Sequence, residues 1–293
     1  MANKEIKIGD YVINEKSRPF MIAEIGINHN GDINIAKKLI DAANATGWHS
    51  VKFQKRTPEL AVPEAQKSKP RETPWGTMTY LEYKYRVEFE QPEYDVIDAY
   101  CKDKGMSWSA SPWDMPSLEF LLKYDVPYLK IASASNGRDE MIAEAAKSGK
   151  PIILSTGMTT MEEIDHAVEV LEKNGHGDYI LMHTNSAYPA PTKDLNLRMI
   201  ETLRDRFDCL VGYSGHEANI EPTIAAVVLG ACCVERHVTL SHEMWGSDQK
   251  ASLEVNAMDM LNKRITTVFE ALGDGVKYMS ESEAKQREKL RTV

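Results

Sequence analysis

The 293-residue chain carries 44 acidic and 35 basic side chains, a formal net charge of −9 that argues against a nucleic-acid-binding protein. Its 42% hydrophobic and 27% charged content is typical of a globular protein. The first residues lack the apolar segment of a signal peptide, and the longest apolar run is shorter than the ~20 residues of a membrane span. We therefore expect a cytoplasmic protein without a membrane partner, and reduced thiols at its four cysteines, which show no CxxC spacing.

From residue 20 almost to the last residues, a short apolar or β-branched run, a polar turn and a helical stretch alternate. This alternation predicts parallel strands joined by crossover helices. The strands are placed at 20–25, 50–54, 106–111, 127–132, 151–156, 179–184, 210–214 and 232–238. Eight such units favour an α/β fold of the closed (β/α)8 class, the TIM barrel. An open doubly wound sheet is the alternative, but the glycine-rich dinucleotide turn that it often carries is missing from the sequence.

Capping residues predict where several helices begin. Asp32 precedes the apolar-periodic stretch 35–43, Thr160 forms a capping box with Glu163, and Asp194 precedes a helix over 195–207. The final barrel helix is expected over 256–272.

Three segments fall outside the repeat in what we expect to be one catalytic domain, 1–293. Residues 1–19 read as a short β-hairpin that plugs the bottom of the barrel. Residues 57–91 are too long for an ordinary loop between a strand and a helix, so they form either a lid over the site or a subunit contact. Residues 273–293 form a charged, partly helical tail.

Polar residues gather where the predicted strands end, which is where barrel enzymes assemble their active sites. Lys52, Lys130 and Arg236 lie within otherwise apolar strands, and an unpaired buried cation costs several kcal/mol. Each therefore needs an anion, supplied either by a local carboxylate or by a ligand. Lysines beside serines and backbone amides suit a phosphate or a phosphate-plus-carboxylate ligand.

Two histidines follow consecutive strands. His216 ends the seventh predicted strand and His237 lies in the eighth, so both imidazoles can reach one ion. Two histidines with oxygen partners suit Mn, Fe, Co or Zn with positions open for a substrate oxygen. His29 is a third candidate over the pocket, although its turn needs no functional explanation.

Seven motifs in order resemble the barrel of the N-acetylneuraminate (sialic acid) synthase family. They are AEIGINHNG (23–31), VKFQ (51–54), LKIAS (129–133), ILSTGM (153–158), GYSGH (212–216), ERH (235–237) and WGSDQ (245–249), and the resemblance covers roughly residues 5–290. It implies a transferase that condenses phosphoenolpyruvate with a free aldose, N-acetylmannosamine or a relative. The product is a nonulosonic acid.

The resemblance also implies roles for individual residues. Seven would hold the phosphate and carboxylate of phosphoenolpyruvate: Lys52, Ser111, Lys130, Ser133, Ser155, Ser186 and Ser214. His216 and His237 would ligate a divalent metal, usually Mn²⁺, whereas Glu24, Gln54, Tyr188 and Asp248 would contact the open-chain sugar. The candidate catalytic residues are Glu24, for proton transfer, and the two metal-binding histidines. Arg236 is a further candidate for binding substrate.

Two departures from the family pattern concern the sugar. Residue 186 is Ser, a residue familiar from synthases of other nonulosonic acids, where bacterial N-acetylneuraminate enzymes have Asn. The sequence also lacks their C-terminal antifreeze-like domain, whose arginine contacts the sugar in the partner subunit, so we expect the 57–91 insertion to close the site. The alternatives are a synthase of another 2-keto-3-deoxy sugar acid, including one using a phosphorylated aldose, and a non-catalytic sugar-acid-binding barrel. A homo-oligomer is expected.

Overall fold

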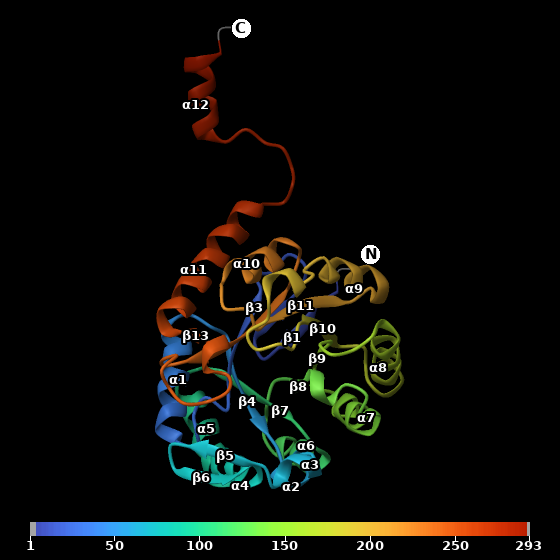
Figure 1. The fold of residues 1–293 in the computed structure, drawn as a ribbon. Helices are drawn as coiled ribbons and strands as arrows, with labels where there is room; N and C mark the ends of the chain where they lie inside the picture. The colour runs from blue at the N-terminus through green and yellow to red at the C-terminus, as the bar shows by residue number, and fades with distance from the viewer. Residues whose placement is uncertain (1–3, 292–293) are drawn as a thin grey trace.

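The computed structural model describes residues 4–291, and a parallel barrel lies at their centre (Figure 1). Its strands are β3 (Phe20–Gly26), β4 (Ser50–Lys55), β7 (Ser107–Pro112), β8 (Leu129–Ile131), β9 (Ile152–Ser155), β10 (Tyr179–Thr184), β11 (Leu210–Gly215) and β12 (Cys233–Thr239). They pair in the order β7-β4-β3-β12-β11-β10-β9-β8. β7 and β8 close the ring without a regular ladder, where the Ser109 hydroxyl donates to the Tyr128 carbonyl at 2.7 Å. The predicted TIM barrel and its strands are confirmed.

Helices follow the strands and cover the outside of the barrel (Figure 1). They are α1 (Ile33–Ala45), α5 (Gln91–Asp103), α6 (Met115–Leu121), α7 (Asp139–Lys147), α8 (Met161–Asn174), α9 (Met199–Phe207), α10 (Glu221–Val228) and α11 (Val255–Leu272). Asp32 caps α1 by accepting from the Asn34 amide, and Thr160 and Glu163 form the predicted capping box of α8.

The predicted start of the helix after Asp194 is wrong. Asp194 ends a short 3-10 turn, η2 (Thr192–Asp194), and α9 begins only at Met199. The reason lies at Asn196, whose φ of 44° is left-handed, so a right-handed helix cannot run through it.

Side chains of the barrel strands alternate between the inside of the barrel and the helices, as the period of a strand requires. On β3, Ile22 joins the inner apolar layer, whereas Met21 and Ala23 pack toward the helices. On β12, Cys233 faces inward and Val234 outward. The same alternation decides which polar residues reach the barrel mouth.

The N-terminal end of the barrel is closed by a hairpin. β1 (Ile6–Ile8) and β2 (Tyr11–Ile13) pair antiparallel. Ile6, Ile8 and Ile13 pack onto inner-layer side chains such as Phe20 and Ile153. The hairpin therefore plugs the bottom of the barrel, as the sequence predicts.

The insertion between β4 and α5 is ordered and packs beside the barrel mouth. It contains α2 (Pro58–Ala61), α3 (Glu64–Lys67), β5 (Pro70–Thr73), β6 (Gly76–Thr79) and α4 (Tyr80–Val87), and β5 pairs with β6. Tyr83 and Val87 cluster with Ile27 and Trp245, which belong to the loops after β3 and β12. The insertion is thus held against two loops of the mouth.

After β12 the chain passes through η3 (Gln249–Ala251) and the short β13 (Leu253–Glu254), which pairs with β12. Beyond α11, an extended segment leads away from the barrel to α12 (Glu281–Leu290) (Figure 1). Within residues 4–291, no helix is both long and apolar enough to cross a membrane.

Candidate active site

A cavity of about 180 Å³ opens at the carboxyl ends of the barrel strands. The site residues predicted from the sequence line it, except His29, Arg236 and Asp248: Glu24, Lys52, Gln54, Ser111, Lys130, Ser133, Ser155, Ser186, Tyr188, Ser214, His216 and His237. Six further residues complete the lining: Trp113, Ala132, Ala134, Met158, Thr184 and Glu235. The barrel thus brings side chains from all eight strands or the turns after them to one place.

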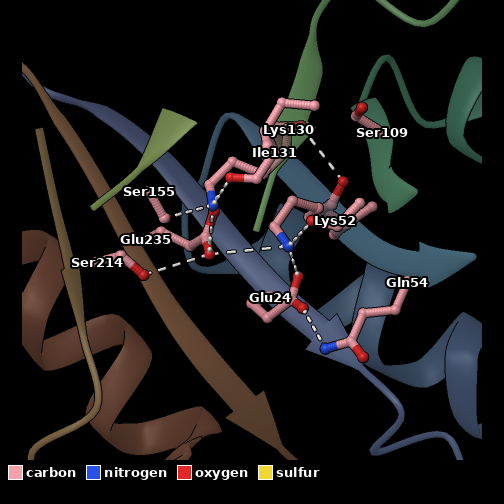
Figure 2. Close-up of polar contacts among 12 residues, drawn as sticks. Glu24, Lys52, Gln54, Ser109, Lys130, Ile131, Ser155, Ser214 and Glu235 are labelled. Atoms are coloured by element: carbon pink, nitrogen blue, oxygen red, sulfur yellow. Dashed lines mark hydrogen bonds and ion pairs between the residues drawn. The ribbon is translucent and has the colours of Figure 1, made fainter. Parts of the chain in front are cut away.

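Two lysines and two carboxylates form a buried ionic network on the cavity floor (Figure 2). Lys52 Nζ lies 2.6 Å from Glu24 Oε2 and 3.7 Å from Glu235 Oε1, and Lys130 Nζ lies 3.9 Å from the same Glu235 oxygen. Lys130 also donates to the Ser155 hydroxyl at 2.6 Å. Because the charges balance, both cations are neutralised before any substrate arrives, and each still has a hydroxyl beside it.

The network sets the protonation of its members. Burial raises the pKa of Glu24 to about 7, although the Lys52 ammonium opposes the shift. Burial also disfavours the charged form of Glu235, but Lys130 and Lys52 outweigh it and hold the pKa of that carboxyl below its usual range. Burial lowers the pKa of Lys130. Glu24 is therefore the carboxyl in this group that can carry a proton near neutral pH.

Glu235 is a site residue that the sequence reasoning missed. It lies between the two lysines, and the Ser214 hydroxyl donates to it at 3.3 Å. The signal was available, because residues two apart on a strand share a face. An inward His237 requires an inward Glu235.

The same parity corrects the prediction for Arg236, which faces away from the cavity. Its guanidinium lies 3.1 Å from Glu217 Oε1 and donates to the Thr223 hydroxyl at 2.8 Å and the Asn219 carbonyl at 3.1 Å. Arg236 is 1% exposed. The anion that this buried cation needs is Glu217, and its contacts are structural.

A cradle of donors lies on the β8–β10 side of the cavity. The Gly157 amide donates to the Ser133 hydroxyl at 3.1 Å. A Cβ at position 157 would lie 2.7 Å from Ser133 Oγ and would clash with Ser186 Oγ. The two hydroxyls thus close around Gly157, which has no side chain, and two hydroxyls so placed suit an anionic oxygen.

His216 and His237 lie on the β11–β12 side, with ring centroids 5.5 Å apart. The Asn185 carbonyl, 2.6 Å from His216 Nδ1, can only accept, so this nitrogen carries the proton. The His216 Nε2 lone pair is then free to accept from the Tyr188 hydroxyl at 3.0 Å. This backbone contact orients the ring as in metal-bound histidines.

The two imidazoles fit a metal ion. His237 Nδ1 is buried and has no hydrogen-bond partner within residues 4–291. Burial lowers the pKa of His216 to about 4 and also lowers that of His237, so both rings are neutral at physiological pH, the form that ligates metals. In the same part of the chain, no three His, Cys, Asp or Glu side chains group closely enough to hold an ion. Two histidines would thus leave several coordination positions open.

Gly26 holds Glu24, Gln54 and His237 close together. Its φ of 56° is left-handed. A Cβ there would lie 3.2 Å from Glu24 Oε1, 3.2 Å from Gln54 Nε2 and 3.3 Å from His237 Cε1. The turn after β3 therefore requires glycine both for its backbone and for the space it leaves.

Two other predicted residues lie outside the cavity. Asp248 lies in the loop after β12, and the Ser247 hydroxyl donates to its carboxylate at 2.7 Å. Burial raises the pKa of Tyr188, and the nearby Asp248 carboxylate adds to that rise. Asp248 is close to the mouth but does not line it. His29 stacks on Phe89 with ring centroids 3.8 Å apart, so it is a packed side chain and not a third imidazole over the pocket.

The barrel and the polar cavity at its strand ends define the class of the TIM-barrel enzymes. Residues 39–277 match the NeuB family. The chain is 40% identical over 252 residues to N-acetylneuraminate-9-phosphate synthase of Drosophila melanogaster, covering 84% of this chain and 67% of that protein. It is 37% identical to N,N'-diacetyllegionaminic acid synthase of Campylobacter jejuni, covering 92% and 81%.

The structures agree with the sequences. The crystal structure of N-acetylneuraminic acid synthetase from Leptospira borgpetersenii superposes with a TM-score of 0.87 at 30% identity, covering 99% of each chain. The chain therefore belongs to the NeuB family, and it is a synthase-type transferase.

Proposed function

We propose that this enzyme condenses phosphoenolpyruvate with an aldose, N-acetylmannosamine or a related N-acetylated sugar, and releases phosphate to form a nonulosonic acid. The observation that carries the proposal is a single cavity that combines two buried lysines, a serine and amide cradle, and two neutral imidazoles. The relatives named above are synthases of such acids.

Phosphoenolpyruvate brings a phosphate and a carboxylate to the lysine side of the cavity. Lys130 with Ser155, and Lys52 with Ser111, offer two ammonium–hydroxyl pairs, with distances of 2.6 Å and 3.0 Å. The site is neutral without substrate, so a polyanion binds best when Glu24 takes up a proton and releases Lys52. The pKa of about 7 at Glu24 makes that protonation inexpensive near neutral pH.

The divalent metal would lie at His216 and His237, with oxygen ligands from water and substrate. Two imidazoles suit Mn, Fe, Co or Zn, and the family resemblance makes Mn²⁺ the first choice. When bound, the ion would polarise the aldehyde oxygen of the sugar. His216 Nε2 has a single lone pair, so the Tyr188 hydroxyl that donates to it at 3.0 Å would give way to the ion.

The bonds change in a fixed order. C3 of phosphoenolpyruvate attacks the aldehyde carbon, whose oxygen takes up a proton, and C2 becomes an oxocarbenium ion. Water adds to C2 and loses a proton, and the C2–O bond to phosphate then breaks. Lys52 and Lys130 stabilise the phosphate while C2 becomes an oxocarbenium ion and while phosphate leaves. Glu24, which accepts from Gln54 Nε2 at 3.0 Å, lies on the sugar side and is the residue that we assign to proton transfer.

The direct test is release of inorganic phosphate from phosphoenolpyruvate by the purified protein with Mn²⁺. The sugar panel contains N-acetylmannosamine, its 2,4-diacetamido relatives, mannose and arabinose 5-phosphate. Release that depends on one sugar and stops with a chelator is expected. A folded protein that binds Mn²⁺ yet releases no phosphate with any of these sugars or with N-acetylmannosamine 6-phosphate would instead support the non-catalytic sugar-acid-binding alternative.

Homo-oligomer formation and a cytoplasmic location remain predictions from the sequence. Sedimentation of the purified protein tests the first.

A further inference from the structure

A second group of cations lies where the insertion packs against the loops of the barrel mouth. The insertion cation cluster consists of Arg56, which follows β4, Arg71 on β5 and Lys84 on α4. Arg71 Cζ lies 5.7 Å from the Tyr80 ring centroid and 4.5 Å from that of Tyr83. Lys84 Nζ lies 5.2 Å and 5.3 Å from the same two rings. Two cations therefore share one pair of aromatic rings.

One member of the cluster, Arg56, contacts side chains that line the cavity on its sugar side. Arg56 donates to Gln54 Oε1, and its Cζ lies 4.7 Å from the Trp113 ring centroid. Gln54 and Trp113 both line the cavity. Gln54 is on β4, which is diametrically opposite β10 in the strand order, and Ser186 of the anion cradle follows β10. The cluster is therefore remote from the Ser133 and Ser186 cradle, whereas Lys52 and Ser111 lie on its side of the cavity.

Arg56 and its neighbour Lys55 have partners within the protein. Arg56 Nε lies 3.3 Å from Glu88, and Lys55 Nζ lies 3.4 Å from Glu88 and 3.1 Å from Glu90. This part of the cluster is neutralised by its own carboxylates and needs no ligand.

Arg71 and Lys84 have no such partner. Within residues 4–291, neither forms an ion pair or donates a hydrogen bond, although Lys84 is only 8% exposed. Arg71 Nε and the Tyr83 hydroxyl are buried and equally unpartnered in that part of the chain. Burial, with Arg56 and Arg71 nearby, lowers the pKa of Lys84 to about 7, and Asp248 opposes that shift without forming an ion pair. Three donor groups thus meet without an acceptor.

Contacts with aromatic rings do not account for this arrangement. A cation–π contact contributes about 0.5–2 kcal/mol, whereas burying an unpaired charge costs several kcal/mol. Two like charges over the same rings also repel each other. A guanidinium, an ammonium and a phenol hydroxyl together match the oxygens of a phosphate group.

We propose that Arg71, Lys84 and the Tyr83 hydroxyl bind a phosphate monoester at the end of the aldose remote from its aldehyde, so that the preferred acceptor is a sugar phosphate. The inference rests on the proposed function, which it makes more specific. Gln54 and Glu24 then contact the aldehyde half of the sugar. The insertion determines the preference for a phosphorylated over an unphosphorylated sugar.

The test compares N-acetylmannosamine with N-acetylmannosamine 6-phosphate at saturating phosphoenolpyruvate and Mn²⁺, following phosphoenolpyruvate consumption. The kcat/KM for the phosphorylated sugar is expected to be at least about 100-fold higher, because hydrogen bonds to charged groups contribute roughly 1.5–3 kcal/mol each. Lys84→Gln should lower the ratio of the two kcat/KM values at least about 10-fold. Arg71→Gln, at a partly exposed site that tolerates substitution better, should lower it similarly.

Lys67→Gln is the matched control. Lys67 is on α3 of the same insertion and pairs with Glu59 and Glu64 at 2.9 Å and 2.8 Å, so its loss should leave the ratio unchanged. Two results together would overturn the phosphate site and leave the proposed function standing. They are a kcat/KM for the unphosphorylated sugar that is equal or higher, and a ratio of the two kcat/KM values that neither Lys84→Gln nor Arg71→Gln changes. Absence of phosphoenolpyruvate consumption with every aldose would overturn both.

Discussion

The two ends of the barrel are built from the same strands, but one end is a packed apolar layer and the other is a polar cavity. At the N-terminal end, the inward residues are apolar, such as Ile22, Ile153 and Cys233, and the hairpin packs onto them. Two residues further along the same strands, the inward positions are Glu24, Ser155 and Glu235, which line the cavity. Two residues, one period of a strand, therefore separate the apolar layer from the polar layer.

This difference shows how the fold tolerates a charged cavity. The apolar layer and the helices contribute stability below the mouth, so the upper layer can hold groups that pack poorly. Buried charges on the cavity floor are balanced in pairs, whereas the lower layer contains few polar atoms. Substitutions at the two ends should therefore have separable effects, on turnover at one and on stability at the other.

The largest effect is expected at the mouth. His237→Ala should lower Mn²⁺-stimulated phosphate release about 10³-fold or more, because loss of one of two imidazoles removes metal binding. The unfolding midpoint should change little. Release titrated against Mn²⁺, together with thermal unfolding, checks both statements. His242→Ala is the control, because His242 follows β12, on which His237 lies, and its ring is half exposed. Full activity in His237→Ala would contradict the metal proposal.

The adjacent residue should behave in the opposite way. Arg236→Met leaves Glu217 buried without its cation, and breaking such a pair costs about 3–5 kcal/mol of unfolding free energy. Turnover of the folded fraction should stay far above that of His237→Ala. Denaturant unfolding gives the free energy. The double variant R236M/E217M should recover most of the loss, since it removes both charges; no recovery would mean that Arg236 acts otherwise.

A smaller effect separates two inward positions of β9. Ile153→Ala, in the lower layer, should lower the unfolding free energy by about 2–5 kcal/mol while the folded enzyme stays active. Ser155→Ala, two residues along, removes the hydroxyl that accepts from Lys130 and should lower kcat/KM for phosphoenolpyruvate about 10-fold. Equal stability losses in the two variants would contradict the division between the layers.

The smallest effect is a change in pH dependence. The pKa of Glu24 rises from 4.5 to about 7 on folding, so between these values the folded state binds more protons than the unfolded state. Its contribution to stability is therefore full below pH 4.5 and is lost as the pH rises through about 7. Glu24→Gln should remove this slope, as measured by unfolding across the same range. A pH profile of kcat/KM should lose an ionisation near 7 in the same variant.

The alternation of apolar runs and helical stretches determined the barrel, because eight β/α units with one buried strand each have few other ways to close. The strand ends likewise determined most of the cavity, because all the predicted residues but three line it. The alternation of side chains along β12 also predicts that Glu235 faces inward with His237 and that Arg236 faces outward, although the sequence analysis did not use it. The strand–helix alternation, the strand ends and the alternation of side chains along a strand depend on neighbouring residues, so they can be predicted from the sequence alone.

Tertiary structure alone decided how the charges pair. Lys52 and Lys130 share Glu235 because β4, β8 and β12 converge across the barrel, whereas Arg236 finds Glu217 on the outside. Arg71 and Lys84 meet over Tyr80 and Tyr83 only because α4 folds back beside the β5–β6 hairpin. A charge interacts through space with groups that are distant in the chain, and no pattern of spacing along the sequence reports that distance.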